Sequence, residues 1–589
     1  MTDQPGALLQ AGSAQLLQLP ERPEPISIPV LIVGGGPIGL ALAADLGRRG
    51  INTLLIERRQ DKLGTAKMLE VGTRTMEFCR RLGIADEVRN WGFPFHYNLD
   101  TVFVTNLESA EIGRVRNASL GTFSASRYSP ERARPCPQTW FDPILQRSAR
   151  SYSRNELRYE SELETFVQDS EAVLATVLDR NAGRRYTIRA SYLVGCDGAD
   201  STTRKLLGIE VRGCKQIDLT INAYLRIPDF LSLHPTKQAF RYVFVGPEGT
   251  WSFLTMIDGK DLYRLQILGL DRETVEKVDI DAMVRRCFGR SIYYTLEEKI
   301  VWTRQMTIAD RFMDGRVFLA GDACHAHPPN GGLGMNTGLQ DSFDLSWKLA
   351  AVLQDWGAPG LLDSYELERR PASSRATEVS LLNYGRLMDR SAHPDIEALT
   401  EAGHAARREI GARLMRANER SWHPPGVHLG YIYDPSPVVE PDGTPKPEDD
   451  TFGYVPTTYP GARAPHFWLA TDLSIIDLFG DGFVLLVFDQ TDTFPIEEAA
   501  RQRHLPLAVQ KIVSNEAAAL YERPLVLVRP DGHVAWRGDS LPADCLALID
   551  TVRGAGPRMA ARRGSTRAVS AAEAPRPMPV PTRPQFRAG

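Results

Sequence analysis

Three glycines follow the first long apolar run of this chain and limit what its N-terminal part can fold into. In "PVLIVGGGPIGLALAADLGRRGINTLLIERR" the run from Val30 to Val33 is typical of a buried parallel strand. Gly34, Gly36 and Gly39 then form a GxGxxG pattern. The first glycine permits a tight turn, the second lets a pyrophosphate approach the backbone, and the third lets a helix pack closely on the strand.

A second apolar strand completes this unit. The segment "TLLIE" ends in Glu57, about 20 residues after the glycines, where an acid can accept hydrogen bonds from a ribose. The intervening helix would point its positive N-terminal end and free N–H groups at phosphates. The stretch therefore predicts a site for an adenine dinucleotide, but it does not distinguish FAD from NAD.

Two later segments repeat the sequence of an apolar strand, an acid and glycines. "SYLVGCDGADSTTRKLLGI" places Asp197-Gly198 at the end of a strand and Ser201 at the start of a helical pattern. Alone, it fits an ordinary turn with a capping Asp equally well. "RVFLAGD" ends in Gly321-Asp322 and runs into "ACHAHPPNGGLGMNTGLQDSFDLSWKL".

A long helix is predicted after the last glycines. Apolar residues recur at spacings of three and four, which places them on one buried face: Leu339, Phe343, Trp347, Ala350 and Leu353. Asp341 and Asp344 come early in this helix and Lys348 comes later, the order that a helix dipole favours.

Composition excludes several classes of protein. The 589 residues exceed one ordinary core, and a net charge of −4 gives no reason to expect a nucleic-acid partner. The seven cysteines contain no CxxC pair, which argues against a disulfide framework and a zinc site and indicates a reducing cytoplasm. No run approaches the roughly 18 apolar residues of a membrane span, and the N-terminus lacks a secretory signal pattern.

The three ordered motifs together resemble the single-component (class A) FAD-dependent aromatic hydroxylases, in particular their phenol hydroxylase branch. The likeness covers most of the chain from about residue 28 to 374 and continues in "YPGARAPHFWL". It implies an α/β fold: a Rossmann-like FAD-binding domain, an inserted antiparallel-sheet substrate domain and a C-terminal thioredoxin-like α/β domain.

The resemblance also implies a set of cofactor-binding residues. Asp322 would hold a ribityl hydroxyl, Gln138 would lie along the ribityl–pyrophosphate chain, and Asp197-Gly198 would serve FAD and the incoming NADH or NADPH. The full expected set is Gly34, Gly36, Pro37, Gly39, Glu57, Arg58, Lys67, Gln138, Asp197, Gly198, Asp322, Pro329, Gly332, Gly334, Met335 and Asn336. Lys67 departs from the family pattern, because many relatives carry an arginine there and a lysine lacks its bidentate fork.

The glycine-rich stretch has a physical reason in this family. Reduced flavin carries negative charge near N1 and the C2 carbonyl, which a helix N-terminus preceded by glycine N–H groups stabilises. His325 and His327 could instead bind a metal, but no third ligand of normal spacing lies nearby. We therefore expect no metal and read these histidines as packed or hydrogen-bonded side chains.

The substrate-binding residues are less well marked. Residues 212–304 contain alternating strands such as "AFRYVFVG", "TWSFLTMI" and "YRLQILGL", expected to form a wall over the flavin. A phenol hydroxylase works better on the phenolate, so a base or a positive neighbour should stand near the ring. The candidates are His96, Arg241, Tyr242 and Tyr263, and no spacing rule selects among them.

The expected domain boundaries follow from these segments. We expect an N-terminal extension (1–27), an FAD-binding domain (28–400) with the sheet inserted at about 212–304, and a connecting segment (401–464). A thioredoxin-like domain without CxxC (465–555) and a disordered Arg/Pro-rich tail (556–589) complete the chain.

The resemblance implies hydroxylation of a phenolic aromatic compound with NAD(P)H and O2, through a flavin C4a-hydroperoxide. It leaves room for a flavin-dependent dehydrogenase or oxidase, and for a non-catalytic flavin-binding assembly protein. We expect a small aromatic partner, no nucleic acid or membrane, and a possible homodimer.

The tail yields a first testable prediction. Seven arginines, six prolines and almost no large apolar residue leave it without a core to contribute. Ending the chain at Ala555 should therefore leave FAD content, activity and oligomeric state unchanged, as measured by absorbance, NAD(P)H oxidation and size-exclusion chromatography. Loss of solubility or assembly in the shortened chain would contradict this expectation.

Overall fold

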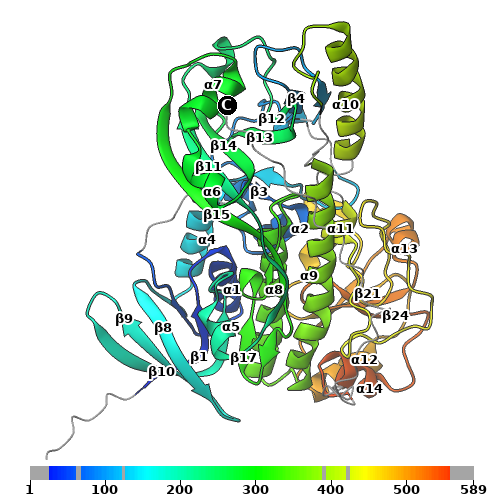
Figure 1. Ribbon diagram of the computed structural model, residues 1–589. Coiled ribbons are helices and arrows are strands. Elements are labelled where there is room, and N and C mark those ends of the chain that lie inside the picture. The colour runs from blue at the N-terminus through cyan, green and yellow to red at the C-terminus, as the bar shows by residue number, and fades with distance from the viewer. Residues whose placement is uncertain are drawn as a thin grey trace, which may run out of the picture.

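A computed structural model describes residues 25–60, 68–117, 119–122, 126–387, 393–419 and 425–556. Within these ranges two large sheets lie one above the other, and a smaller C-terminal domain packs beside the lower one (Figure 1). Most of the expected N-terminal extension and nearly all of the expected tail lie outside the described residues.

The lower sheet has a parallel core in the order β17-β10-β1-β2-β7. Its strands are β1 (Ile26–Val33), β2 (Thr53–Ile56), β7 (Asn155–Arg158), β10 (Arg184–Gly195) and β17 (Val317–Leu319). Val30 and Ile32 pack with helices on one face, while Leu31 and Val33 join an apolar cluster on the other. Burial on both faces explains why the β1 sequence reads as a continuous apolar run.

Helices and a hairpin cover the two faces of this sheet. The helical layer contains α1 (Pro37–Arg48), α4 (Gln138–Ser151) and α8 (Leu333–Leu353). The antiparallel strands β8 (Ser161–Gln168) and β9 (Val173–Asp179) extend β10, and β16 (Met313–Asp314) pairs with β17. Smaller elements nearby are α2 (Thr73–Arg81), α3 (Ala85–Arg89), α5 (Thr202–Leu206), β3 (Glu70–Val71) and β6 (Arg134–Pro135).

The upper sheet has the order β18-β15-β11-β14-β13-β12-β4-β5. Its strands are β4 (Thr101–Val104), β5 (Gly113–Val115), β11 (Val211–Arg226), β12 (Arg241–Gly246), β13 (Gly249–Met256), β14 (Leu262–Leu270), β15 (Thr295–Ala309) and β18 (His325–Ala326). The expected insertion at 212–304 was therefore too narrow, because β4, β5 and β18 come from outside it. Local sequence could not reveal this, since β4 joins the sheet by pairing with β12, far along the chain.

Helices pack on both sides of the upper sheet. On one side are α6 (Arg272–Lys277) and α7 (Ile280–Phe288). On the other is α10 (Glu401–Glu419), whose Ile410 and Leu414 join the apolar cluster of Phe103 and Val243. Part of the segment expected to be a mere connection (401–464) thus covers the sheet.

Helix α8 and the long α9 (Gly360–Leu387) run side by side through the middle of the molecule (Figure 1). The prediction of a single buried face on α8 was wrong: every residue from Asn336 to Ala351 is buried. The C-terminal domain packs against the side that a two-layer arrangement would leave exposed, so Asp344 and Lys348 need partners inside the protein.

The C-terminal domain has a sheet in the order β22-β21-β23-β24, in which only β21 and β22 are parallel. Its elements are β21 (Phe483–Val487), α12 (Phe494–Gln502), β22 (Leu507–Lys511), α13 (Asn515–Tyr521), β23 (Leu525–Val528), β24 (Val534–Gly538) and α14 (Cys545–Val552), preceded by α11 (Pro425–Leu429), β19 (Trp468–Ala470) and β20 (Leu473–Ser474). Together with the two larger sheets, this confirms the predicted fold class. Cys545 is a free thiol on α14.

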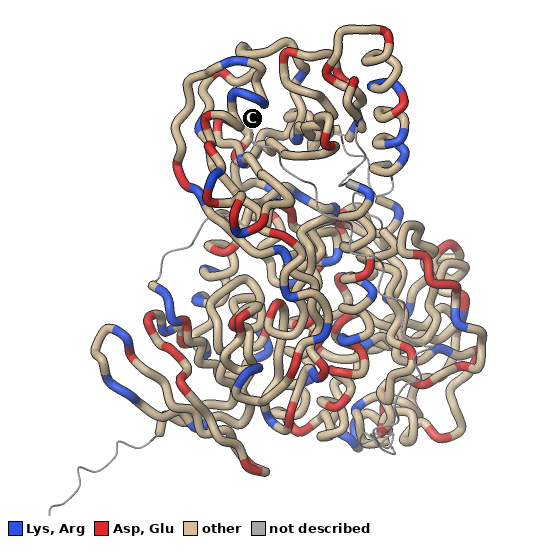
Figure 2. The backbone as a smooth tube through the Cα atoms, viewed as in Figure 1, with Lys and Arg blue, Asp and Glu red and all other residues tan. Residues whose placement is uncertain are grey.

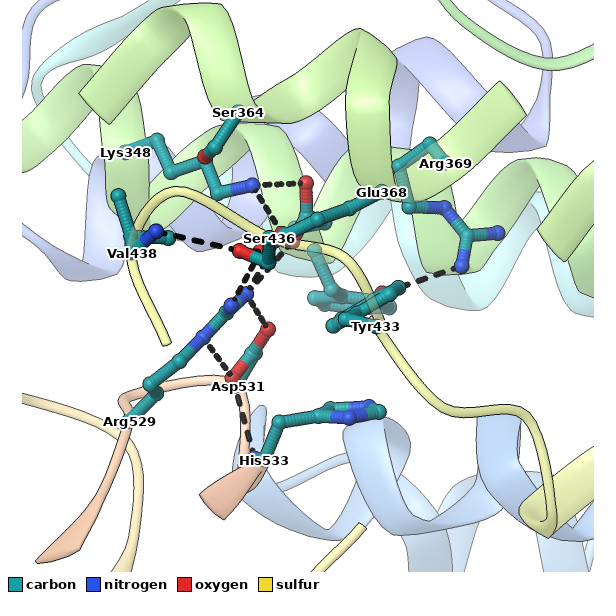
Figure 3. A network of polar contacts seen from close by, with 12 residues as sticks. Lys348, Ser364, Glu368, Arg369, Tyr433, Ser436, Val438, Arg529, Asp531 and His533 are labelled. Carbon is teal, nitrogen blue, oxygen red and sulfur yellow. Dashed lines mark hydrogen bonds and ion pairs between the residues drawn. The ribbon is translucent and has the colours of Figure 1, made fainter. Parts of the chain in front are cut away.

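The turn between β23 and β24 lies buried against α8 and α9 (Figure 3). Arg529 donates hydrogen bonds to Glu368 at 2.6 and 2.9 Å, to Asp531 at 2.6 Å and to Asp344 at 3.1 Å. Lys348 contacts Asp344 at 2.8 Å and Glu368 at 2.6 Å. Two cations and three carboxylates are thus buried together at the domain seam.

This buried ion network is sensitive to the loss of any member. Burial would raise the pKa of the Glu368 carboxyl, but Arg529 and Lys348 hold it well below its usual range. Glu368 therefore stays ionised in the interior. Removing one partner of a buried pair costs about 3–5 kcal/mol, because the remaining charge stays desolvated.

Charges elsewhere are mixed. Figure 2 shows basic and acidic backbone segments interspersed over the upper sheet, the lower sheet and the C-terminal domain. None of the described helices combines the length and apolar content needed to cross a bilayer.

We expect Arg529→Met to destabilise the protein by about 3–5 kcal/mol in urea or thermal unfolding, because Asp531 loses its ion-pair partner and Glu368 keeps only Lys348. Arg523→Met is the matched control: Arg523 pairs with Asp539, whose side chain is 70% exposed, and such pairs contribute about 0–1 kcal/mol. Equal effects of the two substitutions would show that the buried network does not hold the domains together.

Candidate functional site

The predicted cofactor motifs meet at one edge of the lower sheet. Gly34 follows β1, Glu57 follows β2, Asp197 lies just past β10, and Asp322 lies just past β17. These four strands are parallel neighbours, so their carboxyl ends lie side by side. This is the edge at which α/β sheets bind dinucleotides.

The glycine turn after β1 has a distinct geometric reason at each position. Gly34 has φ +114°, and a Cβ there would lie 2.4 Å from the Cys196 carbonyl oxygen. A Cβ on Gly39 would lie 2.0 Å from the Gly34 oxygen, so only glycine lets α1 pack this close. A Cβ on Gly36 would meet no other described atom within 4 Å, which leaves the helix N-terminus open to a ligand. Pro37 begins α1.

Glu57 is buried and fixes the glycine turn. Its Oε2 accepts a hydrogen bond from the Gly35 N–H at 2.8 Å, and its Oε1 accepts from the backbone and Nε of Arg59 at 2.9 Å. Burial would raise the pKa of Glu57, but hydrogen bonds from Arg59 and Gly35 lower it. The carboxylate is therefore ionised and still has lone pairs for a ribose. Arg58 is exposed.

Asp197 acts as a cap in this structure. Its carboxylate accepts hydrogen bonds from Ser201 Oγ at 2.5 Å and from the Thr203 N–H at 2.9 Å. The contacts of the Asp197 side chain therefore agree with the alternative reading of the sequence, an ordinary Asp that caps the next helix. Gly198 has φ +81°, and a Cβ there would meet nothing within 4 Å.

The segment after β17 packs on the start of α1. A Cβ on Gly321 or Gly338 would clash with Ile38, which lies two residues after Gly36. Asp322 is exposed in a short 3-10 helix (Gly321–Ala323).

The glycine-rich loop, residues 327–332, leads from β18, which follows this 3-10 helix, into α8. Pro329 is exposed, and its carbonyl accepts a hydrogen bond from the Gly332 N–H at 3.1 Å. Gly332 has φ +64° and begins α8 without a side-chain cap. A Cβ added to Gly332 would meet nothing described within 4 Å, and one added to Gly334 would lie 3.9 Å from the His327 side chain. Met335 packs into the apolar core of the lower domain.

Asn336 holds the first turn of α8 against β3 and α2. Its Oδ1 accepts hydrogen bonds from the Gly72 N–H at 2.7 Å and from Thr75 Oγ1 at 2.8 Å, and its Nδ2 donates to the Gly332 carbonyl at 2.7 Å. The Asn336 side chain therefore serves to position the loop. Any contact of Asn336 with a cofactor would come from its backbone groups.

A buried polar chain supports the loop from behind. Asp341 accepts hydrogen bonds from Arg369 at 2.8 Å and from the Gly321 N–H at 3.0 Å, and its Oδ2 lies 2.6 Å from His325 Nε2. His327 Nε2 lies 2.9 Å from His325 Nδ1. Burial lowers the pKa of His327 well below its ordinary value, so its ring is neutral.

This chain bears on the question of a metal. Within the described residues, Cys324, His325 and Asp341 could together present three ligand atoms to an ion. A cation there would also face the Arg369 guanidinium, which already occupies Asp341. We keep the expectation that no metal binds.

Two remaining cofactor predictions are placed differently. Lys67 lies outside the described residues. Gln138 begins α4, where its N–H donates to the Met68 carbonyl at 3.0 Å and its Nε2 donates to Asp142 at 3.0 Å.

The four substrate candidates do not come together. Tyr242 and Tyr263 lie on the far face of the upper sheet, packed around Phe230 in an apolar cluster. Burial raises the pKa of both phenols, so neither can act as a base near neutral pH. His96 is exposed and lies beside Gly121. Neither tyrosine is on the face that Arg241 occupies, because adjacent strand residues point to opposite faces.

Arg241 begins a row of side chains on the other face, the arginine row. The strand pairing places Arg241 opposite Thr255, Thr255 opposite Arg264, and Arg264 opposite Tyr224. Burial lowers the pKa of the Arg241 guanidinium to about 10; Glu70 opposes this shift and the charge of Arg264 adds to it. Glu70 lies in β3, and its carbonyl accepts a hydrogen bond from Asn336. The arginine row therefore faces β3 and the start of α8.

Sequence reasoning missed Arg264 and the polar residues next to it. Gln266 and Asn222 follow on the same face, joined by a 3.1 Å hydrogen bond. A signal existed in "YRLQILGL", where Arg264 and Gln266 alternate with Leu265 and Ile267. Polar residues alternating with apolar ones in a buried strand indicate a second, functional face.

The residues fit an FAD molecule. Gly36 and Gly198 follow strands of the lower sheet and Gly332 begins α8, and a Cβ on any of them would meet no other described part of the chain within 4 Å. Free N–H groups begin both α1 and α8, where neither helix has a side-chain cap. The edge can therefore receive a phosphate chain at α1 and an electron-rich ring at α8.

Comparisons with known proteins agree with this geometry. Residues 27–380 match the family described as "FAD binding domain", and residues 457–563 match "Aromatic-ring hydroxylase, C-terminal". The FAD-dependent monooxygenase apdD of Emericella nidulans is 31% identical over 87% of this chain and 88% of its own length. Phenol 2-monooxygenase of a Pseudomonas species is 30% identical over 91% of this chain and 94% of its own.

Solved structures show the same architecture. RebC with bound 7-carboxy-K252c superposes with a TM-score of 0.84 and 39% identity, covering 90% of this chain and all of RebC. Aklavinone-11 hydroxylase in a ternary complex with FAD and aklavinone gives a TM-score of 0.76 and 28% identity, covering 89% of this chain and 98% of its own.

The geometry of the glycine turn separates cofactor loss from misfolding. A Cβ at position 36 would meet no other described atom within 4 Å, so Gly36→Val should fold while blocking the pyrophosphate approach. We expect it to keep the circular dichroism of the wild type and lose most bound FAD, measured by absorbance. Gly39→Val should instead fail to fold, because it clashes with the Gly34 carbonyl. Full FAD content in Gly36→Val would remove this turn from the cofactor site.

Proposed function

Because the chain belongs to the family of FAD-dependent aromatic-ring hydroxylases, we propose that it hydroxylates a phenolic aromatic compound whose anionic oxygen is held by the arginine row. FAD is its cofactor, and NADH or NADPH and O2 are its co-substrates. The face that carries Arg241 and Arg264 is the observation on which the proposed mode of substrate binding rests.

The cofactor part of the proposal uses the sheet edge. FAD, when bound, supplies the redox chemistry by which NAD(P)H and O2 are consumed. The proposed contacts are those expected from the sequence: Gly34, Gly36, Pro37, Gly39, Glu57, Arg58, Lys67, Gln138, Asp197, Gly198, Asp322, Pro329, Gly332, Gly334, Met335 and Asn336. We propose that Asn336 and Met335 contribute backbone groups, since their side chains contact protein.

Substrate orientation is assigned to the upper sheet. Two desolvated guanidinium groups lie within electrostatic reach of one another, and Glu70 supplies one negative charge near Arg241, so the pair favours one further anion. A phenolate oxygen meets this need, and holding it there would activate the ring, because a phenolate is more electron-rich than a phenol. A carboxylate on the ring system meets the same need, and the structure of RebC contains a bound carboxy compound, 7-carboxy-K252c.

The other candidates are assigned weaker roles. Tyr242 and Tyr263 support the sheet from its far side, and the exposed His96 has no place in the proposed site. With both tyrosines in the core and His96 exposed, charge on the arginine row takes the place of a catalytic base.

Further parts of the proposal concern the setting of the enzyme. All seven cysteines are free thiols, which favours a reducing cytoplasm. A homodimer remains a prediction. A flavin dehydrogenase, an oxidase or a non-catalytic flavin protein is a weaker alternative, because none requires cations that orient an aromatic ring.

The test is a screen of phenols and hydroxylated aromatic carboxylates for stimulated NAD(P)H oxidation, with product identification by mass. A product one oxygen atom heavier than its substrate supports the proposal. NAD(P)H oxidation that yields only hydrogen peroxide with every compound would favour the oxidase alternative.

We expect Arg241→Met to lower kcat/KM for the best substrate by roughly ten- to a hundredfold, since a hydrogen bond to a charged group contributes about 1.5–3 kcal/mol. FAD content should not change. Tyr242→Phe is the matched control, because it changes the neighbouring residue on the opposite face of β12 and should retain most activity. A larger loss in Tyr242→Phe than in Arg241→Met would reverse the assignment of the two faces.

A further inference from the structure

A cavity lies away from the cofactor edge, where α1 and α2 meet the C-terminal domain. This seam cavity has a volume of about 260 Å³. Its walls include the last residue of α1, the side of α2 that contacts the C-terminal part of the chain, and residues such as Phe479 and Gly532. Nothing in the proposed hydroxylation uses it.

The charges that line the seam cavity are unbalanced. Five arginines contribute to its walls: Arg48, Arg74, Arg80, Arg81 and Arg463. Only three carboxylates accompany them: Glu77, Asp477 and Asp481. The lining therefore carries two more positive than negative charges.

Each of the three carboxylates is already bound. Glu77 accepts hydrogen bonds from Arg74 at 2.6 Å and from Arg463 at 3.1 Å. Asp477 binds Arg80 through both oxygens, at 2.6 and 2.8 Å. Asp481 contacts Arg48, but its side chain is 90% exposed, so solvent screens much of its charge.

Arg81 is the cation left over. In the part of the chain that the structure describes, it makes no ion pair, and its Nη1 is buried without a hydrogen-bond partner. The carboxylate that interacts with it electrostatically, Asp45, is engaged by Arg48 at 2.9 Å and Arg49 at 3.0 Å. The Arg81 guanidinium lies 5.4 Å from the centre of the Phe78 ring. The Arg74 guanidinium lies 4.6 Å from the centre of the same ring.

The surroundings of Arg81 disfavour its charge. Burial lowers the pKa of its guanidinium to about 9; Asp45 opposes the shift, while Arg48, Arg49 and Arg74 reinforce it. A water molecule in the cavity could satisfy the open N–H group but would not compensate the excess charge. A bound anion would do both.

We propose that the seam cavity binds a dianionic tetrahedral oxyanion: inorganic phosphate, or the phosphate group of a small ester. Two negative charges match the excess of the lining, and guanidinium groups bind such oxygens through paired N–H groups. Arg81 and Arg74 supply the donors, since Arg74 Nε is also buried without a partner in the described residues.

The position of the cavity gives the anion a structural effect. It would link α2 to the C-terminal domain through Arg74 and Arg81, while Gly72 and Thr75 at the start of the same helix hold Asn336. The anion would therefore stabilise the docking of the C-terminal domain on the helix that positions the glycine-rich loop.

The experiment is a titration of the full-length, FAD-loaded protein by calorimetry, with thermal unfolding in parallel. Inorganic phosphate, sulfate and glycerol 3-phosphate are compared with chloride at equal ionic strength. We expect saturable binding of one phosphate per chain and a higher melting temperature in phosphate than in chloride. Tighter binding of glycerol 3-phosphate would identify an ester as the ligand, and equal or weaker binding would identify the free ion.

Three variants locate the site. Arg81→Met should weaken phosphate binding by about tenfold or more, because it removes a charge-assisted contact. Asp481→Asn should tighten binding, because it removes a negative charge from the lining of the cavity. Arg185→Met is the control: it removes one exposed arginine of β10, 63% exposed and paired with Glu164, and should bind phosphate like the wild type.

Three outcomes would overturn the proposal. The first is that the wild type shows no saturable phosphate binding. The second is that chloride raises the melting temperature as much as phosphate does. The third is that phosphate affinity is unchanged in both Arg81→Met and Asp481→Asn. The Asp481→Asn variant keeps the test decisive if Arg81→Met does not fold, because Asp481 is an exposed surface residue.

Discussion

Helix α8 is buried on every side, and the charges within it dictate where three other parts of the chain must lie. Asp341 requires Arg369 of α9 and the Gly321 N–H of the segment after β17. Asp344 and Lys348 require Glu368 of α9 and Arg529 of the C-terminal hairpin. Since an unpaired buried charge costs several kcal/mol, these contacts fix the helix, its neighbours and the C-terminal domain as one unit.

This constraint reaches the cofactor site through the start of α8. The glycine-rich loop runs between β18, which pairs with the upper sheet, and α8, which packs on the lower sheet. Asn336 ties the same turn to β3 and α2. The small residues of the glycine-rich loop give it little order of its own. The buried helix α8 that follows it therefore provides the preorganisation that a cofactor site needs.

The motifs at strand ends were predictable, because their requirements are local. Gly34 needs a positive φ and Gly39 a close helix approach, and glycine alone supplies both, so the sequence marks them directly. The face proposed to bind substrate was not predictable in the same way. Arg241 and Tyr242 are adjacent and both plausible, and only the tertiary structure shows that Arg241 lies on the face toward β3 while Tyr242 packs in the core.

By itself the sequence determined the dinucleotide edge, the order of the domains and the absence of a CxxC pair, because each depends on residues close together in the chain. The tertiary structure decided which charges meet. Arg529 lies 161 residues from Glu368, and Arg463 lies 386 residues from Glu77. Burial makes such pairings obligatory without specifying them locally, so the ion network and the seam cavity emerge only when the C-terminal domain docks.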